Sequence, residues 1–250
     1  EITVLLGCKD SGKTYGLSCF ALIDYWVFPH DTLWMISSTE YRGCEMRIWG
    51  DIKKLFNRAK QKFSWLEGHP LESMHAITTE QIDDDREMAR SLKTGLILVP
   101  CKKGNQYVGL SAFQGVKAPR LRHGGDEVAA MNEGFLNAYA NWYGKRDFKG
   151  IMTGNPTDPE DQLCRAAEPV DGGWDNFIDT GKTQTWRSKF FNAFAISFDG
   201  RDSPNDDFDT SKPPVFPFLI SKKGRDAVAA SFGEDSWQVY SQCIGKPNKS

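Results

Sequence analysis

The chain has 250 residues, a length that favours one large domain or one domain with a small appendage. Its hydrophobic content of 40% and charged content of 26% are ordinary for a soluble globular chain, and its formal net charge of -2 excludes a globally basic nucleic-acid-binding protein. The sequence has no membrane-length apolar run, no signal-peptide layout and no metal-binding spacing among its six cysteines, so we expect a reduced, cytoplasmic protein.

The first 27 residues predict a strand, a phosphate-binding loop and a helix. Residues 2–6, ITVLL, are mostly apolar and predict a short strand, and the apolar residues within 13–27 fall mostly at helical spacing. Between them, GCKDSGKT has the Gly-x-x-x-x-Gly-Lys-Thr spacing of a P-loop. The two glycines let successive N–H groups turn inward around an anion, and the helix points its unpaired N-terminal amides at the same place. The stretch therefore predicts binding of a nucleoside triphosphate.

Two residues of this loop have further roles. Lys13 supplies a positive charge for the β and γ phosphates, and Thr14 supplies a hydroxyl for Mg²⁺. The chain begins directly on the preceding strand, with nothing upstream to hold an adenine ring, so we expect the natural chain to extend further upstream. The predicted nucleotide-binding residues are Gly7, Cys8, Lys9, Asp10, Ser11, Gly12, Lys13 and Thr14.

The next elements alternate between strand and helix. Residues 32–37 and 95–100 predict apolar strands, and a long helix is expected over residues 41–63. A small basic and aromatic patch follows, for which we weigh contact with DNA against ordinary surface. It consists of Lys102, Lys103 and Tyr107.

Asp126 and Glu127, followed by a helical run over residues 131–143, have the layout of a catalytic carboxylate pair. In that layout the first carboxylate holds Mg²⁺ through water, and the second polarises the attacking water as general base. The preceding residues, RLRHGG, lack the apolar residues of a buried strand. We therefore expect this strand to be short or to lie at a less covered position of the sheet.

The segment FKGIMTGNP predicts a strand over residues 148–153 that ends at Gly154-Asn155-Pro156. Ligands of open α/β sheets bind at the carboxyl ends of strands, so Asn155 is a candidate sensor of the γ-phosphate, with a simple turn as the alternative. Beyond it we expect a short helix over residues 159–167, one or two strands within 184–198, and helices over 222–232 and 234–244.

GCKDSGKT, the Asp126-Glu127 pair and TGNP, in this order and spacing, resemble the ATPase half of the large terminase subunit of tailed double-stranded DNA bacteriophages. The ending EDSWQVYSQCIGKP resembles the segment that joins that ATPase to its nuclease half. The resemblance implies an α/β P-loop NTPase of the additional-strand catalytic glutamate type, with a mostly parallel sheet sandwiched by helices and a small C-terminal lid. It implies an ATPase core over residues 1–180 and a lid with the start of a linker over 181–250, so we expect no nuclease activity from this segment.

The same resemblance implies an ATP-driven motor that uses Mg²⁺ and translocates double-stranded DNA. Its implied partners are the DNA, a portal protein, a small terminase subunit and further copies in a ring, commonly a pentamer. Its implied location is the cytoplasm of the infected bacterial host, at the procapsid portal and without a membrane. Carried onto this chain, Asp126 holds the metal, Glu127 activates water, and residues 153–155 couple hydrolysis to movement.

Two positively charged positions complete the implied site. Lys9 stands where the family often has an arginine; it keeps the charge but loses the planar fork that grips phosphate. For the arginine that a neighbouring subunit contributes, Arg120 and Arg122 lie closest upstream of the acids. The predicted catalytic residues are thus Glu127, Lys13, Lys9, Asn155, Arg120 and Arg122.

Three alternatives are weighed against the packaging motor. A helicase or other translocase explains the loop equally well, but the chain has no second RecA-like half. A kinase or small GTPase fits poorly with the 112 positions between Lys13 and Asp126, and no NKxD motif is present. A nucleotide-binding module that does not turn over stays open because of the irregular strand before Asp126.

Overall fold

The computed structural model describes residues 1–80, 92–101, 116–145, 147–206, 213 and 215–248. Its strands belong to a mostly parallel, mixed sheet of nine strands among the described residues. The chain divides into two compact units. Unit 1 comprises residues 1, 14–126 and 131–151, and unit 2 comprises residues 2–13, 127–130 and 152–250.

The sheet of unit 1 is centred on β2 (Thr32–Ser37), whose six residues are all buried. β2 pairs in parallel with β5 (Gly95–Leu98) on one side and with β6 (Arg120–Gly125) on the other. β4 (Ala76–Thr78) pairs antiparallel with both β5 and β3 (His69–Leu71). An almost continuous apolar run such as TLWMIS is typical of a strand covered on both faces, which is where β2 lies.

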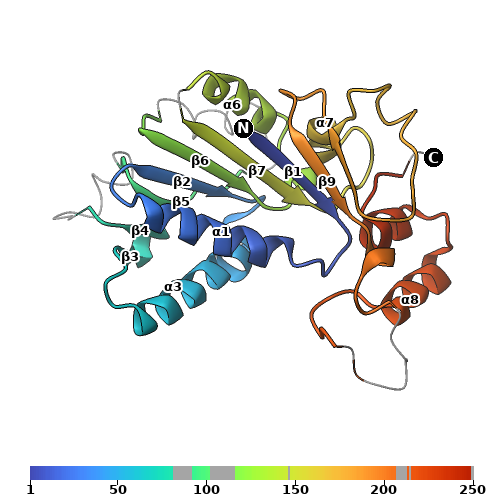
Figure 1. Cartoon of the computed structure of the whole chain (residues 1–250), viewed down its shortest axis with the longest axis horizontal. Coiled ribbons are helices and arrows are strands. Elements are labelled where there is room, and N and C mark those ends of the chain that lie inside the picture. The colour runs from blue at the N-terminus through green and yellow to red at the C-terminus, as the bar shows by residue number, and fades with distance from the viewer. Residues whose placement is uncertain (81–91, 102–115, 146, 207–212, 214, 249–250) are drawn as a thin grey trace. The chain divides into compact units, whose positions relative to one another are not determined.

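Helices cover both faces of this sheet (Figure 1). α1 (Lys13–Val27) and α3 (Gly50–Lys62) pack on one face in a core that includes Leu22, Trp34 and Phe56. α6 (Gly134–Tyr143) covers the other face. The expectation of a mostly parallel sheet sandwiched by helices is therefore confirmed.

The long helix expected over residues 41–63 is present as three consecutive helical segments. They are α2 (Tyr41–Cys44), the π-helical η1 (Glu45–Trp49) and α3. The π turn leaves Ile48 and Trp49 in the core of unit 1. Because a π turn inserts an extra residue per turn, it changes which side chains face the sheet before and after it.

The expectation that β6 is short or poorly covered is wrong. β6 pairs with β2 along all six residues, and five of its six residues are buried. Arg122 is only 1% exposed, and its guanidinium contacts Asp24 at 3.2 Å and Asp147 at 3.1 Å. Arg120 contacts the other oxygen of Asp24 at 3.0 Å. Buried charges are tolerated when they are paired in this way, so a polar sequence can form an inner strand.

The next residue of β6, His123, is also satisfied inside the protein. Its two ring nitrogens lie 2.7 Å from the hydroxyl of Tyr139 and 3.0 Å from Ser37 Oγ. The rings of Phe135, Tyr139 and Trp142 on α6 pack around the imidazole. Burial lowers the pKa of His123 to about 3, so the ring is neutral in the folded protein at neutral pH.

In unit 2, β1 (Ile2–Gly7) pairs in parallel with β9 (Phe194–Phe198), which pairs antiparallel with β8 (Gln184–Arg187). The β1–β9 pairing joins residues from both sides of the boundary expected at residue 181. β7 (Phe148–Gly154) runs from unit 1 into unit 2. The remaining elements are η2 (Glu72–Met74), η3 (Val128–Ala130), α7 (Gln162–Ala167), η4 (Gly200–Asp202), α8 (Lys222–Phe232) and η5 (Val239–Ile244).

Capping residues set the starts of two of these helices. α7 begins at Gln162 because Asp161 accepts a hydrogen bond from the backbone N–H of Cys164 at 2.8 Å. Ser221 caps α8 in the same way. All six cysteines are free thiols. In the described part of the chain, no helix has the length and apolar character needed to span a bilayer.

The buried His123 predicts a specific pH dependence of stability. The unfolded chain binds a proton near pH 6.5 that the folded protein does not bind until about pH 3. This contribution to stability is therefore complete above pH 6.5 and is lost as the pH falls, at about 1.4 kcal/mol per pH unit. Urea unfolding should show that the free energy of unfolding falls less steeply between pH 7 and pH 4 for the His123→Gln variant than for wild type. His30→Gln, which alters a side chain that is 68% exposed, is the control; equal declines for wild type and His123→Gln would contradict the assignment.

Candidate nucleotide-binding site

The loop between β1 and α1 is held by backbone hydrogen bonds to later segments of unit 2. The backbone N–H of Cys8 donates to Phe198 O at 3.1 Å, and the N–H of Lys9 donates to Gln242 O at 2.8 Å. Asp10 O accepts from the N–H of Ile220 at 3.2 Å. Because the first two amides are already used, the predicted phosphate cradle consists of the amides that follow, from Asp10 onward.

The geometry of the loop fits an anion-binding turn. Asp10 and Gly12 have left-handed backbone angles, with φ of 53° and 78°. Lys13 Nζ donates to the carbonyl oxygens of Gly7 at 3.2 Å and Cys8 at 2.7 Å, and to Ser11 Oγ at 2.9 Å. The ammonium is thus folded against the loop, where phosphate oxygens can replace these acceptors.

Cys8 within this loop is not a reactive thiol. Its side chain is buried, and burial raises its pKa to about 11. A thiol with such a pKa is protonated at neutral pH and is a poor nucleophile. Among the described residues, Cys8 therefore acts through its backbone and its packing against Cys243 and Ile220.

Within unit 1, Thr14 Oγ1 donates to Asp126 Oδ1 at 3.0 Å across 112 residues of sequence. Asp126 is 2% exposed and directly follows β6. Its backbone N–H donates to Ser37 O at 2.8 Å, which extends the β2–β6 ladder by one bond and fixes the carboxylate at the end of the strand. The predicted metal ligands Thr14 and Asp126 are therefore in contact.

The donors at this contact fit Mg²⁺. A hydroxyl and a carboxylate are hard oxygen ligands, and Mg²⁺ is usually bound by one or two carboxylates together with waters and substrate phosphates. In the part of the chain that the structure describes, no group of three or more His, Cys, Asp and Glu side chains is arranged to hold a metal. An ion bound here would therefore take most of its ligands from the nucleotide and from water.

Glu127 begins a segment of unit 2 and has a left-handed backbone with φ of 59°. A non-glycine residue in this region is strained, and such strain is often found at functional sites. The end of β7 lies beside it, because a Cβ on Gly154 would come within 3.2 Å of the backbone N of Val128. Asn155 follows at the carboxyl end of β7 and is partly exposed. The predicted base and the predicted sensor thus come from neighbouring segments.

The remaining predicted residues have different surroundings. Arg120 and Arg122 are engaged with Asp24 and Asp147 inside unit 1. A guanidinium that is 1% exposed, as in Arg122, cannot reach a neighbouring subunit without breaking these pairs, so the geometry favours a structural role for both. Lys102, Lys103 and Tyr107 lie outside the described residues.

Sequence reasoning missed the residues that hold the loop. Gly245, which ends η5, has φ of 75°, and a Cβ at this position would lie 2.5 Å from Cys8 N and 2.6 Å from Phe198 O. Ser197 Oγ donates to Gly245 O at 2.9 Å. The only signal in the sequence is the Gly-Lys-Pro turn after a helical run, which indicates a helix end but not its contact with the loop.

We predict that Gly245→Ala lowers the free energy of unfolding by about 3 kcal/mol or more, because left-handed strain adds to an overlap with backbone atoms. Gly181→Ala is the matched control: φ is 73°, and the nearest side-chain atom to the new Cβ is 3.9 Å away. The Gly181→Ala variant should lose about 1–2 kcal/mol of unfolding free energy, from backbone strain alone. Urea unfolding of both variants measures the difference, and equal losses would show that the close packing against the loop is unimportant.

Comparisons with known proteins show what this fold is similar to. No protein-family model and no curated protein sequence matches the chain. A large terminase from a thermophilic bacteriophage superposes with a TM-score of 0.57 at 12% identity, covering 98% of this chain and 47% of that chain. Its complex with ADP gives 0.57 at 14% identity over the same shares, and its complex with ATP-γ-S gives 0.50 at 13% identity over 92% and 44%.

The chain therefore spans less than half the length of these terminases. At such identities the likeness shows the fold alone. That fold is a mostly parallel α/β sheet covered by helices, as in the matched part of these large terminases, so the predicted α/β fold class is confirmed.

Proposed function

We propose that this chain is the ATP-hydrolysing motor domain of a viral DNA-packaging terminase, which couples hydrolysis to translocation of double-stranded DNA into a procapsid. The hydrogen bond between Thr14 and Asp126 carries the proposal, since it joins the two residues that would share Mg²⁺. The fold of large terminases and the P-loop geometry support it. In this proposal the bound ATP and Mg²⁺ supply the phosphoryl group and neutralise its developing charge.

The residues of the chain have separate roles in this proposal. Lys13 and the loop amides bind the β and γ phosphates, with Lys9 as an additional charge. Glu127 accepts a proton from the attacking water, and Asn155 responds to the presence of the γ-phosphate. The neighbouring copies in a ring, the portal protein, the small terminase subunit and the DNA are the proposed partners, in the cytoplasm of an infected bacterium.

A different P-loop translocase or helicase remains the second candidate, because the same contacts would serve it. The non-hydrolysing module is less favoured, since its main support was the irregular strand before Asp126. β6 is a regular strand that pairs with β2 along its whole length and ends at Gly125, directly before Asp126, so it gives that alternative no support.

The role of Glu127 is tested by steady-state ATPase measurements on Glu127→Gln. We predict that nucleotide binding is kept and that turnover falls by about 100-fold or more, because the general base is lost. Glu160→Gln makes the same change at an exposed carboxylate and should leave both unchanged. Lys13→Ala should weaken nucleotide binding itself. Equal turnover in Glu127→Gln and wild type would remove Glu127 as the base.

The role of DNA is tested through the salt dependence of binding. If Lys102 and Lys103 contact phosphates, replacing both by Gln should reduce the slope of log affinity against log salt by about 1–2, since each phosphate contact releases about one counterion. Replacing Lys222 and Lys223, which begin α8, provides a control of equal charge. An unchanged slope would assign the patch to ordinary surface.

A further inference from the structure

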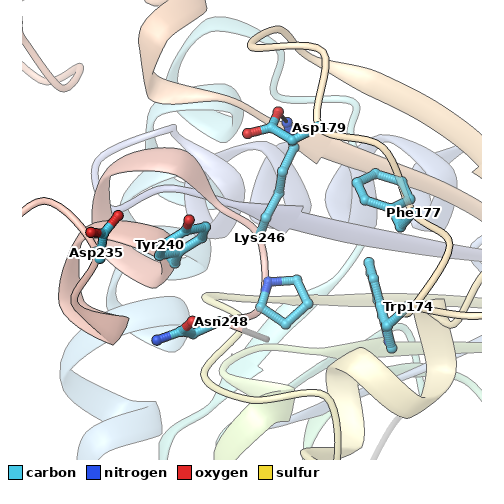
Figure 2. Close-up of a pocket in the computed structure, with 8 residues that line it drawn as sticks. Trp174, Phe177, Asp179, Asp235, Tyr240, Lys246 and Asn248 are labelled. Carbon is cyan, nitrogen blue, oxygen red and sulfur yellow. Dashed lines mark hydrogen bonds and ion pairs between the residues drawn. The ribbon is translucent and has the colours of Figure 1, made fainter. Parts of the chain in front are cut away.

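Unit 2 contains a cavity of about 500 Å³ that is lined by no residue of the phosphate-binding loop. Three aromatic rings, from Trp174, Phe177 and Tyr240, contribute to its walls together with Pro247. Figure 2 shows Trp174 and Phe177 on one side of the cavity and Tyr240 on the other, with Lys246 between them. The walls thus offer flat apolar surfaces to a ligand.

The charged groups at the floor of the cavity neutralise one another. Lys246 is 4% exposed, and its ammonium pairs with Asp179 and, at 3.0 Å, with Asp199. Arg201 pairs with the same two carboxylates at 2.7 Å and 2.6 Å. Two positive and two negative groups leave no net charge, and Lys246 is not available to a ligand.

Asp235 is the remaining charged residue of the lining, on the side of Tyr240 (Figure 2). Its side chain is exposed, and within the described parts of unit 2 its carboxylate makes no hydrogen bond or ion pair. The cavity therefore carries a net charge of about -1, located at its rim beside an aromatic ring.

The negative charge of Asp235 and the aromatic walls together determine which class of ligand fits the cavity. A phosphorylated nucleotide is disfavoured, because its charge has the same sign as that of Asp235. A lone metal ion leaves most of the volume and the apolar walls unused. A guanidinium fits both features, since it stacks on aromatic faces and pairs with carboxylates through two parallel N–H groups.

We propose that this cavity receives an arginine side chain presented by a different polypeptide, with its guanidinium against the ring of Tyr240 and paired with Asp235. The volume accommodates the side chain together with adjoining backbone. The proposal is independent of ATP hydrolysis, since it uses no residue assigned to that activity.

The test is calorimetric titration of the whole chain with the capped tripeptide Gly-Arg-Gly. The matched tripeptide contains citrulline, which keeps the shape of arginine but carries no charge. We expect the arginine peptide to bind at least fivefold more tightly than the citrulline peptide. We also expect Asp235→Asn to lose at least fivefold in affinity for the arginine peptide, while Glu234→Gln, an exposed neighbour outside the lining, is unchanged.

Equal binding of the two peptides, or an unchanged affinity in Asp235→Asn, would overturn the proposal. So would tighter binding of adenosine monophosphate that competes with the arginine peptide. Sedimentation at rising protein concentration tests the source of the arginine. A monomer that binds the peptide supports a different polypeptide, and self-association that Asp235→Asn abolishes would overturn it in favour of a second copy of this chain.

Discussion

The contact between Thr14 and Asp126 depends on holding a polar strand inside the sheet. Asp126 reaches the hydroxyl because β6 runs beside β2 for its full length and ends there. The strand that achieves this contains two arginines and a histidine, which are costly to bury. Asp24 on α1 and Asp147 before β7 offset the charge, so the position of Asp126 rests on an ion-pair cluster at the opposite end of the strand.

That ion-pair cluster also restricts the register in which β6 can pair with β2. Breaking one buried pair typically costs about 3–5 kcal/mol, because it leaves an uncompensated charge. An apolar strand could slide by two residues and still bury similar side chains, whereas Arg122 and His123 have partners in only one register. The polar residues therefore specify the pairing of β6 with β2 more strictly than apolar residues would, and this specificity is what fixes Asp126.

Sequence reasoning predicted those parts of the fold in which local pattern and tertiary environment agree. The apolar runs of β2 and β7, the helix after the loop and the loop itself follow from periodicity and glycine spacing. β6 was misjudged because its burial depends on distant partners such as Asp24 and Tyr139, which no local pattern shows. The same distinction applies to the candidate site. Thr14 and Asp126 could be identified from sequence motifs. The contact of Gln242 with the loop could not, because it is made by a backbone carbonyl and does not depend on the residue type.

The segment after β9 packs against the predicted phosphate-binding loop within unit 2. Its carbonyl at Gln242 and its packing at Gly245 hold the loop at Cys8 and Lys9, while β9 pairs with the strand that leads into the loop. One residue further, Lys246 is fixed by Asp179 and Asp199. A stretch of five residues thus has tight contacts with the loop at one end and with a buried charge cluster at the other. Because neither contact can be relaxed without exposing or overlapping backbone, a displacement of the loop would be transmitted to this segment rather than absorbed beside the loop.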